Sequence, residues 1–263
     1  MDEALLFVHG WATDNRVWES IAGALAKERT VYNIDLPGHG GKKIWAGPSL
    51  DPAITEVSRY IAALPGKAVV GIGWSLGAQV LIASALREEK KFKALVLAGA
   101  TPSFVEQKDF PWGQPKALVK RMIMDMKKDP AGTVERFYKL NFTDDEIGLP
   151  QVRDFIGRYK YPGPVSCETD EPGCFPVFKY NEITNALEAL YNTDLRQSLG
   201  GLDIPILLVH GERDAICPVG AAHYLNKNIK SSRLVVFENA GHAPFLTEAE
   251  RFKDVLKGFL AEI

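Results

Sequence analysis

Cysteine, long apolar runs and an excess of charge of either sign are all scarce in this sequence. Its 263 residues include only three cysteines, Cys167, Cys174 and Cys217, which are too few for a disulfide framework and typical of a reducing compartment. No apolar run approaches the roughly 20 residues of a membrane span, and we expect no signal segment. The 31 basic and 33 acidic side chains leave no field that favours nucleic acid or a membrane surface. We therefore expect a cytoplasmic, monomeric protein that binds neither.

Short apolar runs rich in β-branched residues recur along the chain and have the length of strands buried on both faces. They are Leu5 to Val8, Thr30 to Ile34, Ala68 to Ile72, Ala94 to Leu97, Ile206 to Val209 and Leu234 to Phe237. Helical periodicity follows several of them, for example after Asn15, after Ser75 and from Phe252 to Phe259. Strands that alternate with helices predict an α/β fold with a mostly parallel sheet flanked by helices.

This alternation stops near Thr101 and resumes near Ile204. The residues between are rich in proline, glycine, aromatic and charged side chains. Helical pieces are expected there around 115–128, 131–140 and 181–191. We predict a core formed by residues 1–101 and 203–263, with a helical cap, or lid, formed by residues 102–202 and inserted after the fourth strand.

Residues 69–81, VVGIGWSLGAQVL, place a lone hydroxyl between two glycines at the end of a buried strand. In a G-x-S-x-G elbow the glycines permit a sharp turn that exposes the serine at the carboxyl end of the sheet. The helix that follows directs its N–H groups toward the same place. A dinucleotide-binding loop has the pattern G-x-G-x-x-G. Counted from Gly71, the third glycine of this pattern would fall at position 76, where the sequence has Leu76, so such a loop is excluded. Taken alone, Ser75 is either a nucleophile or a turn residue.

A serine nucleophile needs a base, and the base needs a group that orients it. The segment FENAGHAPF places His242 after the last strand, and LVHGERD places Asp214 after the strand before it. These residues and Ser75 reach one edge of the sheet in the order Ser, Asp, His, which is typical of α/β-hydrolases. We predict that Ser75, Asp214 and His242 are catalytic.

Other polar residues have plainer interpretations. His9, His39 and His210 end strands or lie in turns, where a structural role is expected, and His223 lies on a surface helix. Asp203 precedes a strand, so it lies at the wrong edge, and Asp35 belongs to a turn. No cofactor and no metal are expected, although Cys167 and Cys174 leave pairing or metal binding as an alternative.

An ester hydrolase also needs two N–H donors where the oxyanion develops. The backbone N–H of Leu76, which follows the serine, is the first candidate. The N–H of Trp11 in the loop HGW is the second. The Trp11 side chain either walls the acyl pocket or packs in the core beside the elbow.

The motifs HGW, DLPGHG, GWSLGA, HGERD and AGHAPF together resemble the α/β-hydrolase superfamily over residues 4–263. More narrowly, GWSLG, HGWATDNRVW, TVERF, TDLRQSL and HAPF are similar to the biotin-synthesis esterases. That family hydrolyses the methyl ester of a pimeloyl chain on acyl-carrier protein and releases methanol. The resemblance implies the same triad and oxyanion donors, with the acyl-carrier protein as partner.

The resemblance also implies roles for cap residues. Its acyl-binding segment corresponds here to Phe137, Tyr138, Lys139, Leu140 and Asn141, with Trp11 beside them. Its carrier-docking arginines correspond to Arg136, Arg153 and Arg158.

Charge adds an independent indication. Residues 110–140 hold seven lysines and arginines against three acids, and Lys120 and Arg121 belong to this basic stretch. An acidic carrier protein would be attracted to such a patch, whereas the alternative is an ordinary solvated helix face.

We therefore expect a cofactor-independent serine carboxylesterase. The alternatives are a broad-specificity carboxylesterase, a thioesterase or a C–C bond hydrolase of the same fold, and more remotely a non-enzymatic ligand receptor on this scaffold.

Overall fold

Six parallel strands form the central sheet of the computed structural model, which describes residues 3–41, 44–64, 66, 68–159 and 180–263. The strands are β1 (Glu3–Val8), β2 (Thr30–Ile34), β3 (Ala68–Trp74), β4 (Phe92–Ala98), β5 (Ile206–Gly211) and β6 (Ser232–Phe237). They lie in the order β2-β1-β3-β4-β5-β6. The central strands are buried on both faces, which explains their unbroken apolar runs. The predicted fold class is confirmed.

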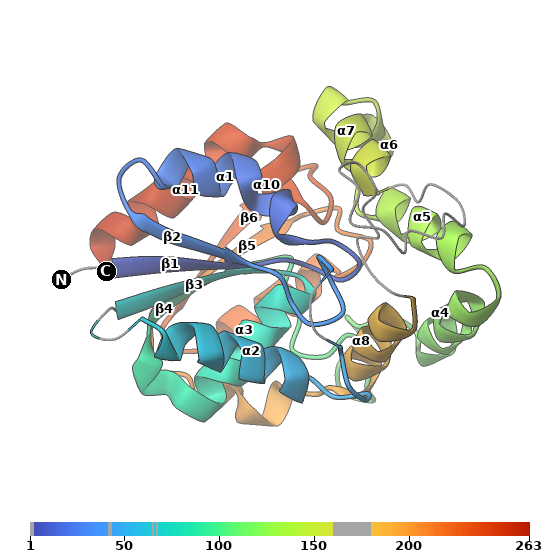
Figure 1. Ribbon diagram of the computed structural model, residues 1–263, viewed down its shortest axis with the longest axis horizontal. Coiled ribbons are helices and arrows are strands. Elements are labelled where there is room, and N and C mark those ends of the chain that lie inside the picture. The colour runs from blue at the N-terminus through green and yellow to red at the C-terminus, as the bar shows by residue number, and fades with distance from the viewer. Residues whose placement is uncertain (1–2, 42–43, 65, 67, 160–179) are drawn as a thin grey trace.

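Helices cover both faces of the sheet (Figure 1), with α1 and α11 on one face and α2 and α3 on the other. The core helices are α1 (Glu19–Leu25), α2 (Asp51–Ala62), α3 (Leu76–Glu88), α9 (Val219–Asn228), α10 (Pro244–Thr247) and α11 (Ala249–Glu262). Short 3-10 turns span Asn15–Trp18, Glu89–Lys91 and Arg196–Gly201. None of the helices within the described ranges is long and apolar enough to cross a bilayer.

Among the described residues between β4 and β5 there are five further α-helices, which we call the cap helices. They are α4 (Lys116–Lys128), α5 (Pro130–Leu140), α6 (Asp144–Ile147), α7 (Pro150–Tyr159) and α8 (Tyr180–Asn192). They project beyond the carboxyl ends of the strands, and the start of β1 and the end of α11 lie at the opposite end of the sheet (Figure 1). The cap helices are therefore placed over the edge where catalytic side chains are expected.

The two chain segments that connect the cap helices to the sheet pair with each other. Ser103 forms an antiparallel bridge with Asp194, and the N–H of Leu195 donates to the carbonyl of Pro102 at 2.8 Å. We call this pairing the neck. The adjoining strands β4 and β5 are themselves neighbours, with Leu97 opposite Leu208.

The predicted cap pieces 115–128, 131–140 and 181–191 are observed as α4, α5 and α8. The short helix α6 and the ten-residue helix α7 were not predicted. The capping box of Thr143 and Glu146 and the helical spacing of Val152, Phe155 and Tyr159 are the signals that could have indicated them. The boundaries 102 and 202 of the cap stay a prediction. Cys167 and Cys174 lie outside the described residues, and Cys217 is buried and unpaired.

Candidate active site

Ser75 occupies the turn between β3 and α3 in a conformation that side chains rarely adopt, with φ 55° and ψ −115°. The two flanking glycines make this turn possible. A Cβ on Gly77 would lie 2.4 Å from the carbonyl oxygen of Val8, and one on Gly73 would lie 2.7 Å from Gly77 itself. The neighbouring backbone thus lies too close to positions 73 and 77 for any residue that has a Cβ. The sequence GWSLG forms the sharp strand-to-helix elbow that its glycines predict.

His242 and Asp214 form a fully buried pair at the same edge of the sheet. The Nδ1–H of His242 donates to Asp214 Oδ2 at 2.6 Å, and Asp214 Oδ1 accepts the N–H groups of Ile216 and Cys217, each at 2.8 Å. Burial alone would raise the pKa of the Asp214 carboxyl. The charge of His242 and the hydrogen bonds from His210 and His242 outweigh burial and hold this pKa well below its ordinary value. Asp214 is therefore a carboxylate that fixes the orientation of the imidazole.

His210 also contacts Asp214, which the sequence interpretation of His210 as a structural residue did not include. Its Nε2–H donates to the carbonyl of Cys217 at 2.6 Å and lies 3.2 Å from Asp214 Oδ2. Two histidines therefore face one carboxylate oxygen. The spacing in HGERD, four residues from His210 to Asp214, is the signal that could have indicated this contact.

The other imidazole nitrogen of His242, Nε2, is buried and has no hydrogen-bond partner within the described part of the chain. Trp74 contacts both the ring and the backbone of His242. The Trp74 indole packs against it with ring centroids 5.5 Å apart, and Trp74 Nε1–H donates to the His242 carbonyl at 2.9 Å. Because Trp74 immediately precedes Ser75, His242 and the elbow are joined through this residue.

The loop after β1 carries Trp11, the second predicted oxyanion donor. In the part of the chain that the structure describes, the backbone N–H groups of Trp11 and Leu76 form no hydrogen bond. The Trp11 indole is buried, donates to the carbonyl of Ile183 on α8 at 2.6 Å and meets the Phe137 ring edge-on at 4.8 Å. Its side chain thus lies between the core and the cap helices.

Two buried histidines, His9 and His39, form hydrogen bonds that hold the loop after β1. His39 donates from Nδ1 to the carbonyl of Pro37 at 2.8 Å and accepts the N–H of Ala12 on Nε2 at 3.2 Å. His9 donates from Nδ1 to the carbonyl of Gly10 at 2.8 Å and accepts the N–H of Leu36 on Nε2 at 2.9 Å. Both rings are therefore neutral. Burial lowers the pKa of each, and the neighbouring His9 helps to lower that of His39 to about 3.

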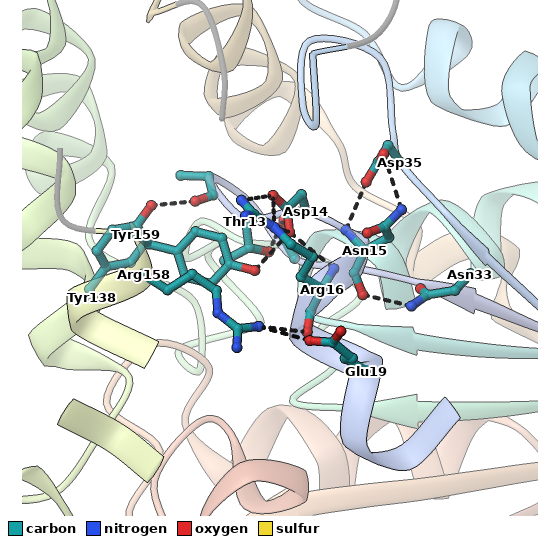
Figure 2. A network of polar contacts seen from close by, with 12 residues as sticks. Thr13, Asp14, Asn15, Arg16, Glu19, Asn33, Asp35, Tyr138, Arg158 and Tyr159 are labelled. Atoms are coloured by element: carbon teal, nitrogen blue, oxygen red, sulfur yellow. Dashed lines mark hydrogen bonds and ion pairs between the residues drawn. The ribbon is translucent and has the colours of Figure 1, made fainter. Parts of the chain in front are cut away.

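Residues of the cap helices α5 and α7 bond to the same loop (Figure 2). The Tyr138 hydroxyl donates to the carbonyl of Ala12, and the Tyr159 hydroxyl donates to Asp14 Oδ1 at 2.9 Å. Arg158 donates to the carbonyl of Arg16 at 3.2 Å. The loop is thus fixed between core and cap.

A cavity of about 220 Å³ lies between α4, α5 and the residues after β5. Phe137, Leu140 and Ile216 contribute to its apolar wall, and Arg121 and Arg136 also line it. Neither Ser75 nor His242 lines this cavity. Two of its lining residues contact other residues of the site: Phe137 packs on Trp11, and the N–H of Ile216 donates to Asp214.

The predicted acyl-binding segment is divided by the structure. Phe137 and Leu140 line the cavity, whereas Tyr138 is buried with its hydroxyl on Ala12. The Lys139 ammonium pairs with Glu135 at 3.0 Å. Asn141 is fully buried, and its side-chain amide donates to the carbonyl of Phe137 at 2.8 Å. Two of the five residues therefore line the cavity, and the other three have partners elsewhere in the protein.

The predicted carrier-docking residues fall into two groups. Lys120, Arg121 and Arg136 lie on α4 and α5, whereas Arg153 and Arg158 lie on α7. Arg121 pairs with Asp125 at 2.9 Å, and Arg136 pairs with Asp129 at 3.3 Å. Arg158 is directed toward Glu19 on α1, at 3.4 Å (Figure 2). The structure does not join Arg158 to the basic residues beside the cavity.

Fold and site geometry define the class of the protein. The alpha/beta hydrolase family model matches residues 5–255, and the chain belongs to this family. Solved structures agree with this assignment. An esterase from Exiguobacterium antarcticum superposes with a TM-score of 0.86 at 25% identity, covering 98% of this chain and 92% of its own. A bromoperoxidase from Bacillus anthracis has the same fold, with a TM-score of 0.86 at 21% identity over 99% of this chain and 92% of its own.

Curated relatives narrow the class. A Nitrosomonas europaea protein named pimeloyl-[acyl-carrier protein] methyl ester esterase is 35% identical over 251 residues, which are 94% of this chain and 92% of that protein. A protein of the same name from Aromatoleum aromaticum is 32% identical over 97% of this chain and 98% of its own. The resemblance that the motifs indicated is confirmed.

Proposed function

We propose that the protein is a serine carboxylesterase that hydrolyses the methyl ester of a pimeloyl chain on acyl-carrier protein, a step of biotin synthesis in the cytoplasm. The observation that carries the chemistry is the buried His242–Asp214 pair, 2.6 Å apart, whose free Nε2 lies at the same sheet edge as the strained Ser75. The relatives named for this ester support the substrate.

In the proposed mechanism, His242 accepts the Ser75 hydroxyl proton on Nε2 while the serine oxygen attacks the ester carbonyl. The oxyanion is stabilised by the N–H groups of Leu76 and Trp11. Methanol then leaves with the proton from His242, and the acyl group stays on Ser75. Water, deprotonated by His242, attacks the acyl-enzyme and releases the free acid.

Asp214 acts through His242. Its carboxylate accepts the Nδ1–H, which keeps the proton-accepting electron pair on Nε2 and stabilises the imidazolium during each step. Because the pKa of Asp214 lies below its ordinary range, the carboxylate stays ionised over the whole working pH range.

The cavity beside Phe137 supports an apolar acyl chain, and the bases at its rim support an acidic carrier. The cap bases pair with three nearby acids, Asp125, Asp129 and Glu135. The surplus positive charge of α4 is then contributed by lysines, among them Lys120, which also lies over the Tyr191 ring. Such a surface speeds encounter with an acidic partner more than it tightens the complex.

The chemistry is tested with Ser75→Ala and a short p-nitrophenyl ester. We expect the variant to fold and to lose hydrolysis and labelling by a fluorophosphonate, because the attacking oxygen is gone. Retained hydrolysis would refute the assignment of the nucleophile. Absence of labelling in the unmodified protein would instead favour a ligand receptor on this scaffold.

The substrate is tested by comparing carrier-bound pimeloyl methyl ester with the free methyl ester. Charge reversal of Lys120, Arg121 and Arg136 should lower kcat/KM for the carrier-bound ester by roughly tenfold more than for the free ester at low salt, because Arg121 and Arg136 also line the cavity that both esters would use. Lys257→Glu on α11 is the matched control. Equal rates on both esters, with no salt dependence, would favour a broad-specificity carboxylesterase.

A further inference from the structure

The segment from Tyr138 to Glu146 runs from the last turn of α5 into α6 and contacts both loops of the proposed site. Its first residue donates a hydrogen bond to the carbonyl of Ala12, next to Trp11. Its last residue accepts the N–H of Gly241 on Glu146 Oε2 at 3.0 Å. One short piece of the cap is therefore bonded at one end to the oxyanion loop and at the other end to the loop of His242.

Tyr138 binds the backbone of Ala12, which is in a strained conformation. Ala12 has φ 55°, a left-handed conformation that costs a residue with a Cβ. Its N–H is bound by His39 and its carbonyl by the Tyr138 hydroxyl, so both polar groups of this residue are fixed. Tyr138 is itself buried against the rings of Phe155 and Tyr159, which leaves its hydroxyl little freedom. Burial raises the pKa of Tyr138, so the hydroxyl stays a donor at working pH.

Glu146 holds the loop of the base. Its buried carboxylate accepts two backbone N–H groups on Oε2, from Thr143 at 2.8 Å and from Gly241 at 3.0 Å. The next N–H, that of His242, donates to the carbonyl of Asn141 at 2.8 Å. Two consecutive N–H groups leading into His242 are therefore bound by the cap. The fit is close, because a Cβ on Gly241 would lie 2.6 Å from that carbonyl oxygen.

We propose that Tyr138 and Glu146 are positioning residues for the hydrolytic reaction: Tyr138 sets the backbone that presents the Trp11 N–H, and Glu146 sets the backbone that presents the His242 imidazole. The inference rests on the proposed function, since these loops matter to rate only if Ser75 is the nucleophile. Oxyanion donors act only within about 2.7–3.1 Å of the developing charge, and a misplacement of about 1 Å can cost roughly 100-fold in rate. The cap thus contributes to catalysis even on an ester too short to reach the cavity.

The test uses p-nitrophenyl acetate and the full-length protein, with Tyr138→Phe, Glu146→Ala, Glu146→Asp and Glu146→Gln. We expect kcat to fall roughly tenfold or more in Tyr138→Phe, Glu146→Ala and Glu146→Asp, with KM changed less than about twofold, since binding of this small ester does not use the cap. Glu146→Gln should retain most of the activity, because its amide oxygen still accepts both N–H groups.

The pH profile separates the two roles. Tyr138→Phe should lower the plateau of kcat without moving its acid limb, because the environment of His242 is unchanged. Glu146→Asp should move the acid limb as well, because a shift of the loop alters the contact between His242 and Asp214. Matched controls remove a phenol hydroxyl on α2, with Tyr60→Phe, and an exposed cap carboxylate, with Asp145→Asn; both should behave as the unmodified protein.

The proposal is overturned if Tyr138→Phe and Glu146→Asp match the unmodified protein in kcat, or if Glu146→Gln is as impaired as Glu146→Asp. Should Glu146→Ala not fold, the conservative variants still decide. A result of this kind leaves the proposed function intact as long as Ser75→Ala is inactive on the same ester. Activity retained in Ser75→Ala would refute the proposed function instead.

Discussion

Replacing His39 with glutamine should remove a defined part of the pH dependence of stability. His39 is fully buried, and its two ring nitrogens are committed in opposite senses, Nδ1–H to the carbonyl of Pro37 and Nε2 to the N–H of Ala12. A proton on Nε2 would replace an accepted hydrogen bond by a clash of two donors. A glutamine amide can supply one donor and one acceptor in the same place but cannot titrate.

The magnitude follows from the difference between the ordinary pKa of a histidine side chain, 6.5, and the pKa of His39 in the folded protein, about 3. Between these values the unfolded chain binds a proton that the folded protein does not, so the free energy of unfolding falls as pH falls, by up to about 1.4 kcal/mol per pH unit. From about pH 7.5 to about pH 5, His39 alone accounts for a loss of about 2 kcal/mol. The nearby His9, whose pKa is also lowered by burial, adds to the loss in the same direction.

The assay is urea unfolding of the unmodified protein and of His39→Gln at both pH values. We expect the variant to be less stable at neutral pH, because packing and the bond to Ala12 are disturbed. We also expect the variant to lose about 2 kcal/mol less than the unmodified protein on acidification. Imidazole NMR provides the direct check, with a neutral Nδ1–H ring that does not titrate above about pH 5. Equal acid losses in the two proteins, or a His39 resonance that titrates near pH 6, would refute the reasoning.

Three further outcomes are expected. Ser75→Gly should be more stable than Ser75→Ala by about 1 kcal/mol in urea unfolding, because glycine adopts φ 55° without strain; equal stabilities would contradict this. Gly77→Ala should cost at least about 2 kcal/mol, since its Cβ would meet backbone at 2.4 Å, whereas Gly23→Ala, with open space on α1, should gain up to about 1 kcal/mol. A thermal midpoint for Gly77→Ala equal to that of the unmodified protein would refute the close approach. His210→Phe should lower kcat on a short ester roughly tenfold with KM unchanged, because it keeps a ring but loses the 3.2 Å contact with Asp214; an unchanged kcat would limit His210 to a structural role.

The sheet was predictable from sequence because its signal is local. A strand that is buried on both faces must be apolar on both faces. Ala68 to Ile72 is such a run and lies within β3, and Ala94 to Leu97 is another and lies within β4. The positions of Ser75, Asp214 and His242 at one sheet edge follow from the same logic, since all three come after parallel strands. Their catalytic roles stay proposals.

The cap contacts could not be predicted in this way. The bond from Tyr138 to Ala12 joins residues 126 positions apart, and nothing in either local sequence specifies the partner. Glu146 looks like one of three consecutive acids at a helix start, yet it alone is buried, where it binds Gly241. Which charged residue faces inward depends on how α6 docks, and that is a property of the tertiary structure.

The neck, where Ser103 pairs with Asp194, has a consequence for how such a protein can change. The residues above the neck are inserted between the neighbouring strands β4 and β5. Backbone pairing at the neck holds the two ends of this insertion close together, so β4 and β5 are connected over a short distance whatever the length of the insertion. The entropy of closing a loop grows only with the logarithm of its length, so lengthening or exchanging residues above the neck costs the sheet little. The residues above the neck can therefore be exchanged as one unit to alter substrate preference, provided that each new cap again bonds to the carbonyl of Ala12 and the N–H of Gly241.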